Sequence, residues 1–145
     1  MALQVKRSKL PNAGKGLYTS KDIKKGEKII EYKGEVIDWK EYTKRVDENK
    51  DWYLFFVNRK KCIDAYGTPQ YKARYANDAR GISRTKGLKN NAIYDVFGDQ
   101  CFIVAARDIK AGEEIFVDYS KSYWDCIRYN IKHGHTKWKT TPSKN

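Results

Sequence analysis

The chain has 145 residues, 40% of them hydrophobic and 33% charged, which is the balance of a single soluble globular domain. Thirty Lys and Arg residues against 18 Asp and Glu give a net charge of +12, so the surface attracts polyanions and acidic proteins. No apolar run approaches the ~18 residues of a spanning helix, and residues 1–9 lack the apolar stretch of a secretory signal. We therefore expect an intracellular protein that does not contact a membrane.

The cysteines and histidines do not form a metal-binding pattern. Cys62, Cys101 and Cys126 are odd in number and widely spaced, which favours buried thiols over a disulfide framework or a zinc site. His133 and His135 lie in a polar tail without nearby Cys or carboxylate partners, so we expect no metal there.

The first half of the chain alternates short strands with turns. We expect strands at residues 4–7 and 17–19, on either side of a turn-rich loop, and a pair of strands within residues 29–37 around Gly34. Residues 39–49 are polar, contain no Gly or Pro, and follow Asp38, a candidate N-cap. This pattern predicts one short helix.

The second half continues in the same style. Residues 51–57 are the most hydrophobic stretch and predict a core strand, which forms a hairpin with residues 62–65. The remaining expected elements are one or two helical turns in residues 73–79, a polar loop at 81–91, strands at 92–96 and 100–106, and a helical turn or two in 125–132 before a basic tail. Many short strands and few helices predict a mostly β domain of small sheets.

A turn followed by a strand occurs twice, and each copy leads to a tyrosine. Residues 22–27 precede Ile29, Ile30 and then Tyr32, while residues 108–113 precede a short apolar strand and then Tyr119. We interpret this short repeat as an organising feature of the fold, since it is too small for a solenoid.

Six pieces of sequence suggest a ligand site, although each is weak by itself. They are Gly14-Lys15-Gly16, Tyr32-Lys33-Gly34-Glu35, Ile63-Asp64-Ala65, Arg74-Tyr75-Ala76-Asn77, Asn91-Ala92-Ile93-Tyr94, and Gly112 to Tyr119 followed by Tyr123-Trp124. In this order and spacing the set resembles the SET domain, a family of protein lysine methyltransferases that use S-adenosylmethionine. The resemblance covers residues 5–125 as a single domain, and residues 126–145 form a basic C-terminal segment.

The resemblance implies a fold and a set of site residues. The fold is a β-clip of several small curved sheets, in which knot-like threading of the C-terminal segment brings Asn77 and Tyr119 together. The implied catalytic residues are Tyr119, Tyr32 and Tyr94, and no metal is required. The implied S-adenosylmethionine-binding residues are Ala13, Gly14, Lys15, Gly16, Asn77, Asp78, Tyr119 and Trp124.

Tyrosines suit this chemistry better than acids or bases. The methyl group on a sulfonium is already electrophilic, so the site must present a neutral amine in line with it. A free lysine has a pKa of ~10.4, and an apolar channel disfavours its ammonium form. Tyrosine hydroxyls can hold the amine by hydrogen bonds, while the ring faces tolerate cationic methyl groups.

The chain departs from the family pattern at two places. Asp78 stands where members commonly have histidine, and the cysteine-rich zinc module that often follows the domain is absent. We expect the segment after residue 125 to close the lysine channel instead. In many members of the family, the residue at the position of Val117 controls how many methyl groups the lysine receives. Since Tyr32 and Tyr94 also keep their hydroxyls, we expect mono- or dimethylation.

The expected substrate is a protein or peptide with a target lysine, histone-like or otherwise, that adds to a sheet edge. The basic surface also allows contact with nucleic acid. Two alternatives stay open: a non-catalytic β-clip ligand-binding module, and a basic nucleic-acid-associated protein with a decayed SET fold. The expected location is cytoplasmic in a microbe and nuclear in a eukaryotic or virus-infected cell, and the sequence does not determine the oligomeric state.

Overall fold

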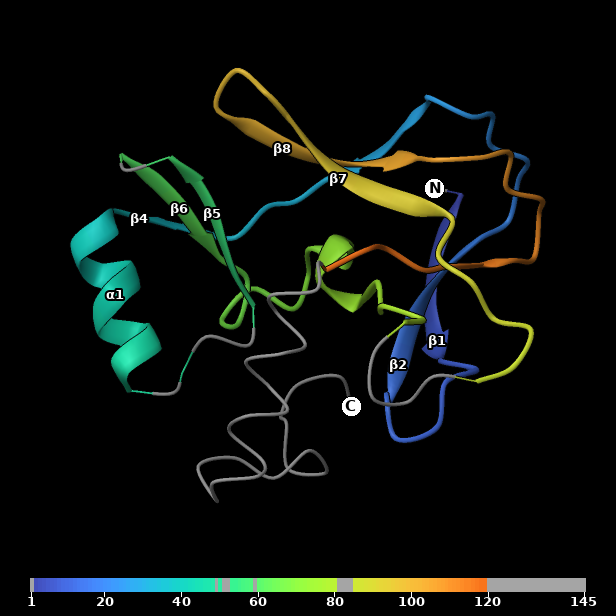
Figure 1. Cartoon of the computed structure of the whole chain (residues 1–145), viewed down its shortest axis with the longest axis horizontal. Helices are drawn as coiled ribbons and strands as arrows, with labels where there is room; N and C mark the ends of the chain where they lie inside the picture. The colour runs from blue at the N-terminus through green and yellow to red at the C-terminus, as the bar shows by residue number, and fades with distance from the viewer. Residues whose placement is uncertain (1, 49, 51–52, 59, 81–84, 120–145) are drawn as a thin grey trace.

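Small antiparallel sheets form the framework of the computed structural model, which describes residues 2–48, 50, 53–58, 60–80 and 85–119 (Figure 1). Within these residues there are three three-stranded sheets, ordered β1-β2-β9, β3-β8-β7 and β4-β6-β5. The strands are β1 (Leu3–Arg7), β2 (Lys15–Thr19), β3 (Lys28–Glu31), β4 (Glu35–Ile37), β5 (Leu54–Asn58), β6 (Lys61–Asp64), β7 (Ala92–Phe97), β8 (Gln100–Ala105) and β9 (Glu114–Ile115). The mostly β fold class is therefore confirmed.

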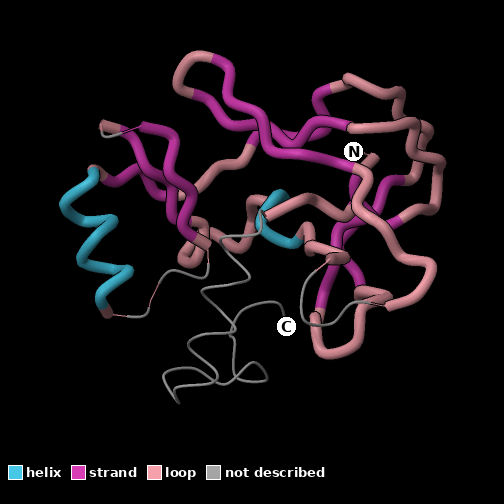
Figure 2. Tube along the Cα trace, in the orientation of Figure 1, coloured by secondary structure: helices cyan, strands magenta, loops and turns pink. Residues whose placement is uncertain are grey.

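The sheets share one main core. Leu17 of β2, Ile63 of β6, Ile103 of β8 and Ile115 of β9 are almost fully buried and belong to one cluster. Because each sheet is too small to bury a face by itself, the three stabilise one another through this cluster. Figure 2 shows the short strands joined by long loops and turns.

The two strands expected around Gly34 are present as β3 and β4, but they do not pair with each other. β3 pairs with β8, and β4 pairs with β6, so the chain changes sheet between them. A Cβ placed on Gly34 would lie 2.6 Å from the backbone oxygen of Asp64 and 2.8 Å from Cα of Ala65. Only glycine allows the two backbones to approach this closely.

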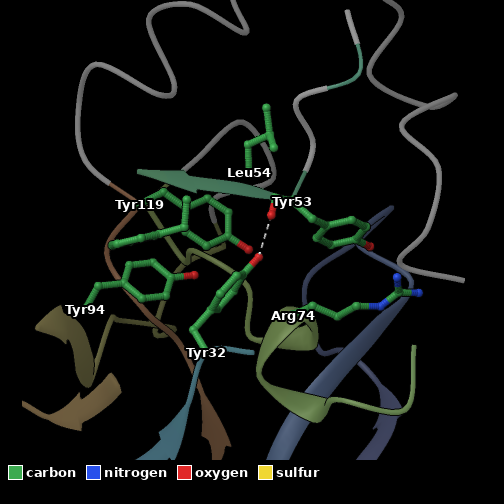
Figure 3. A pocket seen from close by; sticks show the side chains of 7 residues that line it. Tyr32, Tyr53, Leu54, Arg74, Tyr94 and Tyr119 are labelled. Carbon is green, nitrogen blue, oxygen red and sulfur yellow. Dashed lines mark hydrogen bonds between the residues drawn. The ribbon is translucent and has the colours of Figure 1, made fainter. Parts of the chain in front are cut away.

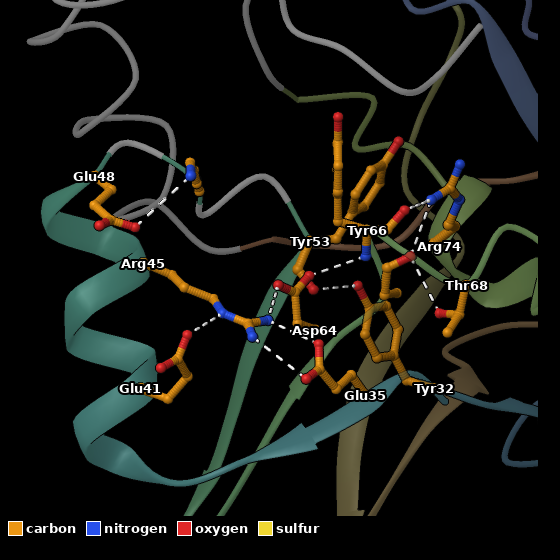
Figure 4. Close-up of polar contacts among 12 residues, drawn as sticks. Tyr32, Glu35, Glu41, Arg45, Glu48, Tyr53, Asp64, Tyr66, Thr68 and Arg74 are labelled. Carbon is orange, nitrogen blue, oxygen red and sulfur yellow. Dashed lines mark hydrogen bonds and ion pairs between the residues drawn. The ribbon is translucent and has the colours of Figure 1, made fainter.

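The single α-helix of the described residues, α1 (Trp39–Asp47), begins where the sequence predicts. Oδ1 of Asp38 accepts the backbone N–H of Glu41 at 2.9 Å, as an N-cap does. The helix buries no residue completely, and Arg45 ties it to the third sheet through Glu35 at 3.0 Å and Asp64 at 2.6 Å (Figure 4). No helix in the described chain has the length and apolar character that crossing a bilayer would require.

β5 is an edge strand, so its prediction as a core strand is wrong, although the hairpin with β6 is confirmed. Phe56 is 40% exposed, while Phe55 and Val57 pack against the main core. The alternation places one face of the strand inward and leaves its outer edge without a neighbouring strand in the described residues.

The two repeated turns are paired with each other. Ile23 and Ile109 form an antiparallel bridge in which each N–H donates to the other's carbonyl, at 2.7 and 2.8 Å. The glycines at equivalent positions, Gly26 and Gly112, have φ values of 87° and 92°, which other residues adopt only with strain. The sequence repeat therefore corresponds to a local two-fold arrangement.

Two aspartates complete this arrangement reciprocally. Oδ1 of Asp22 accepts the N–H of Ala111, and Oδ1 of Asp108 accepts the N–H of Lys25, both at 2.9 Å. Each carboxylate thus caps the turn of the other unit, and residues 22–27 are fixed to residues 108–113.

After β9 the chain passes between two earlier segments, as the expected threading requires. The N–H of Val117 donates to the backbone carbonyl of Asn77 at 2.8 Å, and the carbonyl of Phe116 accepts the N–H of Ala92 at 3.0 Å. The N–H of Asp118 donates in turn to the carbonyl of Ala92 at 3.2 Å. Residues 116–118 are therefore hydrogen-bonded to both ends of the loop that joins the 3-10 helix η1 (Lys72–Tyr75) to β7.

Candidate active site

A pocket with aromatic walls lies where the second and third sheets meet the C-terminal segment (Figure 3). Its walls come from the end of β3, the start of β5, η1, β7 and the segment after β9. The lining residues are Tyr32, Tyr53, Leu54, Phe55, Arg74, Tyr94 and Tyr119. The three tyrosines that the sequence singled out therefore share one pocket.

The three tyrosine rings pack closely. Tyr94 and Tyr119 are stacked with centroids 6.2 Å apart, and Tyr32 meets Tyr94 edge to face at 5.9 Å. Phe55 fills the space beside Tyr94, at 5.0 Å between centroids. The hydroxyls of Tyr32, Tyr94 and Tyr119 point toward the same space in Figure 3. Apolar walls with converging hydroxyls can hold an uncharged polar group such as an amine.

The start of β5 forms the part of the pocket that the sequence did not reveal. The hydroxyl of Tyr32 donates to the backbone carbonyl of Tyr53 at 3.0 Å, which fixes the ring's orientation. Leu54 and Phe55 add apolar surface. The alternation of Tyr53, Phe55 and Val57 was the only available signal, and it indicates an inward face without indicating a pocket.

Arg74 belongs to one of the suggestive sequence pieces, but the sequence predicted no role for it. Its guanidinium lies 4.7 Å from the ring of Tyr53, and Nη1 donates to the carbonyls of Ala65 and Tyr66 at 2.9 and 2.7 Å (Figure 4). This buried cation links the end of β6 to η1 and sets the position of the pocket's wall. The predicted helical turns in residues 73–79 reduce to η1, since Ala76 is already extended.

The predicted cofactor residues Asn77 and Lys15 are in contact. Nδ2 of Asn77 donates to the carbonyl of Lys15 at 3.0 Å, and within the described residues Oδ1 of Asn77 accepts no hydrogen bond. Gly14 has φ of 68°, while Ala13 is buried in a small cluster with Phe116. A side-chain acceptor beside a glycine loop fits the amino-acid end of S-adenosylmethionine.

Glu114 holds the other side of this loop. Its carboxylate accepts the hydroxyl of Ser8 at 2.6 Å and the N–H of Lys9 at 2.8 Å. A Cβ on Gly16 would lie 2.1 Å from Oε2 of Glu114, so any other residue there would displace this carboxylate. Burial, followed by the charge of Glu114, raises the pKa of Tyr18 to about 12.

Tyr119 is anchored at both of its ends. Its hydroxyl donates to the carbonyl of Ala76 at 2.5 Å, and its backbone N–H donates to Oδ2 of Asp78 at 2.8 Å. Ala76 and Asp78 flank Asn77, so Tyr119 and the predicted cofactor residue lie together, as the resemblance implied. The carboxylate of Asp78 accepts the backbone N–H groups of Arg80 and Tyr119 and the side-chain amide of Asn90.

Asn91, which is 1% exposed, fastens the strand that leads to Tyr119. Its Oδ1 accepts the N–H of Phe116 and its Nδ2 donates to the carbonyl of Glu114, both at 2.9 Å. The side chain thus replaces a backbone partner on residues 114–116. Asn91 appeared in the sequence motif, but its role depends on residues more than twenty positions away.

Cys62 and Cys101 are buried, as predicted, and burial raises the pKa of the Cys101 thiol to about 12. No group of three His, Cys, Asp or Glu side chains in the described residues is arranged to hold a metal ion. Trp124, Cys126, His133, His135 and the predicted tail lie outside the described residues.

Comparison with protein families identifies the fold. A model described as the SET domain matches residues 14–120. The chain belongs to the SET-domain family. The match includes the glycine loop from Gly14, the Asn77 region and Tyr119, so it covers most of the site described above.

Two curated relatives of this SET domain are lysine methyltransferases by name. The histone-lysine N-methyltransferase EZH2 of Chaetomium thermophilum is 34% identical over 99% of the chain and 10% of its own length. The N-lysine methyltransferase KMT5A of Xenopus tropicalis is 29% identical over 79% of the chain and 35% of its own length. The chain thus spans about a third or less of these relatives.

A solved structure has the same fold. A chain of an active polycomb repressive complex 2 in the basal state superposes with a TM-score of 0.64 and 30% identity, over 83% of this chain and 15% of that chain. The humanized Chaetomium thermophilum complex bound to the inhibitor GSK126 gives the same TM-score over 82% of the chain.

Proposed function

We propose that this SET domain is a protein-lysine N-methyltransferase that uses S-adenosylmethionine. The observation that carries the proposal is the convergence of the Tyr32, Tyr94 and Tyr119 hydroxyls on an apolar pocket, next to Asn77 and the Gly14–Gly16 loop. The lysine methyltransferase names of the relatives support the same reaction.

Asn77 and the glycine loop are the proposed cofactor-binding elements. Oδ1 of Asn77 is an acceptor for the cofactor's ammonium group, and Nδ2 of the same amide holds the loop through the carbonyl of Lys15. Trp124 and the backbone of Asp78 are further proposed contacts. S-adenosylmethionine supplies a methyl group already activated by its sulfonium.

The pocket's role is to present a neutral amine. Phe55 and Leu54 exclude water from one wall, which disfavours the ammonium form of a lysine whose free pKa is ~10.4. The hydroxyls of Tyr32 and Tyr94 can accept or donate a hydrogen bond and so orient the nitrogen lone pair. Tyr119 closes the pocket where methyl transfer takes place.

We propose mono- or dimethyl-lysine as the product. Tyr94 lies between the rings of Tyr32 and Tyr119, so its hydroxyl takes up space that additional methyl groups would need. Val117, two positions before Tyr119, is fully buried in the main core and leaves this restriction to the tyrosines.

The proposed substrate is a protein segment with a target lysine, from a histone or another protein. The exposed edge of β5 is next to the pocket and offers backbone groups to an extended peptide. We propose that the domain covers residues 5–125 and that residues 126–145 help to close the channel. An intracellular location follows from this reaction and from the histone-lysine activity in the relatives' names, whereas nucleic-acid binding through the basic surface stays a prediction.

Calorimetric titration with S-adenosylmethionine and S-adenosylhomocysteine tests the proposal. We expect saturable binding by the wild type and weaker binding by Asn77→Ala, because Oδ1 is lost. Tyr119→Phe should keep most of the binding but lose transfer of tritiated methyl groups to core histones or a peptide library. Gln100→Ala, an exposed change at the first residue of β8 beside the β7–β8 turn, is the control.

The alternatives make different predictions. A protein that does not bind either compound at millimolar concentration is not an enzyme of this class. Steeply salt-dependent affinity for DNA in such a protein would favour the basic, decayed domain instead.

A further inference from the structure

Asp78 holds three hydrogen-bond donors on one buried carboxylate. The residue is 4% exposed. Oδ2 accepts the N–H of Tyr119, and Oδ1 accepts the N–H of Arg80 and Nδ2 of Asn90, all at 2.8 Å. The carboxylate therefore joins the segment after Asn77, the loop before β7, and the pocket's tyrosine.

Tyr119 is held from two residues on either side of Asn77. The carbonyl of Ala76 accepts its hydroxyl, and the side chain of Asp78 accepts its N–H. The two contacts hold opposite ends of the same residue, which limits both translation and tilt of the ring. A displacement of about 1 Å in a positioned catalytic group costs on the order of 10²-fold in rate.

We propose that Asp78 is a positioning residue for Tyr119, acting through its carboxylate on the Tyr119 backbone and not through contact with the cofactor. The proposal rests on the proposed methyltransferase function. It gives a role to the aspartate that stands where the family resemblance implied histidine.

The three hydrogen bonds that Asp78 accepts require a carboxylate at position 78 as long as residue 90 is an amide. An amide has one acceptor oxygen, so in Asp78→Asn the side-chain NH₂ would face either Tyr119 N–H or the donors of Arg80 and Asn90. Each arrangement leaves a donor facing a donor in a buried place, which costs free energy.

Exchanging the two side chains restores the pattern. In the double variant Asp78→Asn/Asn90→Asp, Oδ1 at position 78 accepts Tyr119 N–H, and its NH₂ donates to the new carboxylate at position 90. That carboxylate also keeps the bond with Ala79 N–H, which Oδ1 of Asn90 accepts at 2.8 Å in the native chain. Only the bond from Arg80 N–H is lost.

The experiment compares wild type, Asp78→Asn, the exchanged pair and Asp99→Asn, an exposed aspartate in the β7–β8 turn that controls for charge. Exchange of the Tyr119 amide hydrogen, followed by NMR with ¹⁵N-tyrosine and assigned with Tyr119→Phe, reports the anchoring directly. Turnover at saturating S-adenosylmethionine with core histones as acceptor, and calorimetric affinity for S-adenosylhomocysteine, report its consequence.

In Asp78→Asn we expect the Tyr119 amide to exchange at least about tenfold faster and kcat to fall about tenfold or more, with cofactor affinity within about threefold of wild type. The exchanged pair should recover both, and Asp99→Asn should match wild type.

Two results overturn the proposal. One is that Asp78→Asn loses cofactor affinity as much as turnover while the exchange rate of the Tyr119 amide is unchanged. That result would make the Asp78 side chain a cofactor contact. The other is a folded exchanged pair that does not regain Tyr119 protection. A wild-type protein that binds no cofactor would refute the proposed function, while amide exchange would still decide whether Asp78 anchors Tyr119.

Discussion

Asn91→Ala is the sharpest test of how the strand before Tyr119 is held. The change removes two 2.9 Å hydrogen bonds and leaves the N–H of Phe116 and the carbonyl of Glu114 without the partners that Asn91 provides. Each unsatisfied buried group costs about 1–3 kcal/mol, so we expect a loss of about 3 kcal/mol. For a chain near 150 residues this corresponds to a fall of roughly 10 °C in Tm.

Thermal and urea unfolding followed by circular dichroism measure this effect. Gln100→Ala, which removes an exposed amide with a 3.4 Å contact, should change stability by less than about 0.5 kcal/mol. A Tm for Asn91→Ala within 2 °C of wild type, with an unchanged urea slope, would show that the amide does not fasten residues 114–116, and the reasoning would fail.

Asn91→Asp separates hydrogen bonding from volume. One carboxylate oxygen can still accept the N–H of Phe116, but the other faces the carbonyl of Glu114. Burial and this repulsion raise the folded-state pKa of the new carboxyl above its unfolded value. The variant's stability is therefore best below the unfolded pKa and is lost as pH rises through the folded one. The gap to wild type should widen from pH 4 to pH 8.

Three further predictions concern separate parts of the domain. Gly34→Ala should destabilise the fold by more than about 2 kcal/mol in urea unfolding, because its Cβ would overlap the backbone of Asp64; wild-type stability would contradict the close approach. Burial, then Glu114, raises the pKa of Tyr18 to about 12, so its contribution is complete below pH 10 and is lost as pH rises through 12. Tyr18→Phe should flatten that alkaline decline, and an unchanged slope would refute the assignment. Tyr94→Phe should increase di- and trimethyl products in mass spectra; an unchanged product ratio would remove Tyr94 as the restricting group.

Local signals in the sequence were reliable where a few neighbouring residues decide the structure. Asp38, followed by a polar stretch without Gly or Pro, determines the start of α1. The repeated turns of residues 22–27 and 108–113 also follow from their own residues, since glycine supplies the positive φ. The resemblance to the SET domain then brought Asn77 and Tyr119 together, which local patterns could not do.

Sequence patterns were less informative where contacts between distant segments determine the structure. The partners of β3 and β4 depend on the close approach at Gly34, which no periodicity reveals. The sequence predicted no site role for Tyr53 or Arg74, because their pocket surfaces exist only after β5, η1 and β7 have assembled. The contact from Asp78 to Tyr119 joins residues 41 positions apart, so its chemistry could be read only from the fold.

The reciprocal turns have a consequence for the order of folding. Residues 22–27 are capped by Asp108, and their bridge requires Ile109, so the first unit has no partner until the chain is synthesised beyond residue 111. Contacts between residues this far apart in sequence form slowly, because the entropy cost of closing a long loop comes before the contacts can stabilise it. We expect β1 and β2 to form a transient hairpin on the ribosome. The pocket should assemble in one late step, when residues 108–113 pair with residues 22–27.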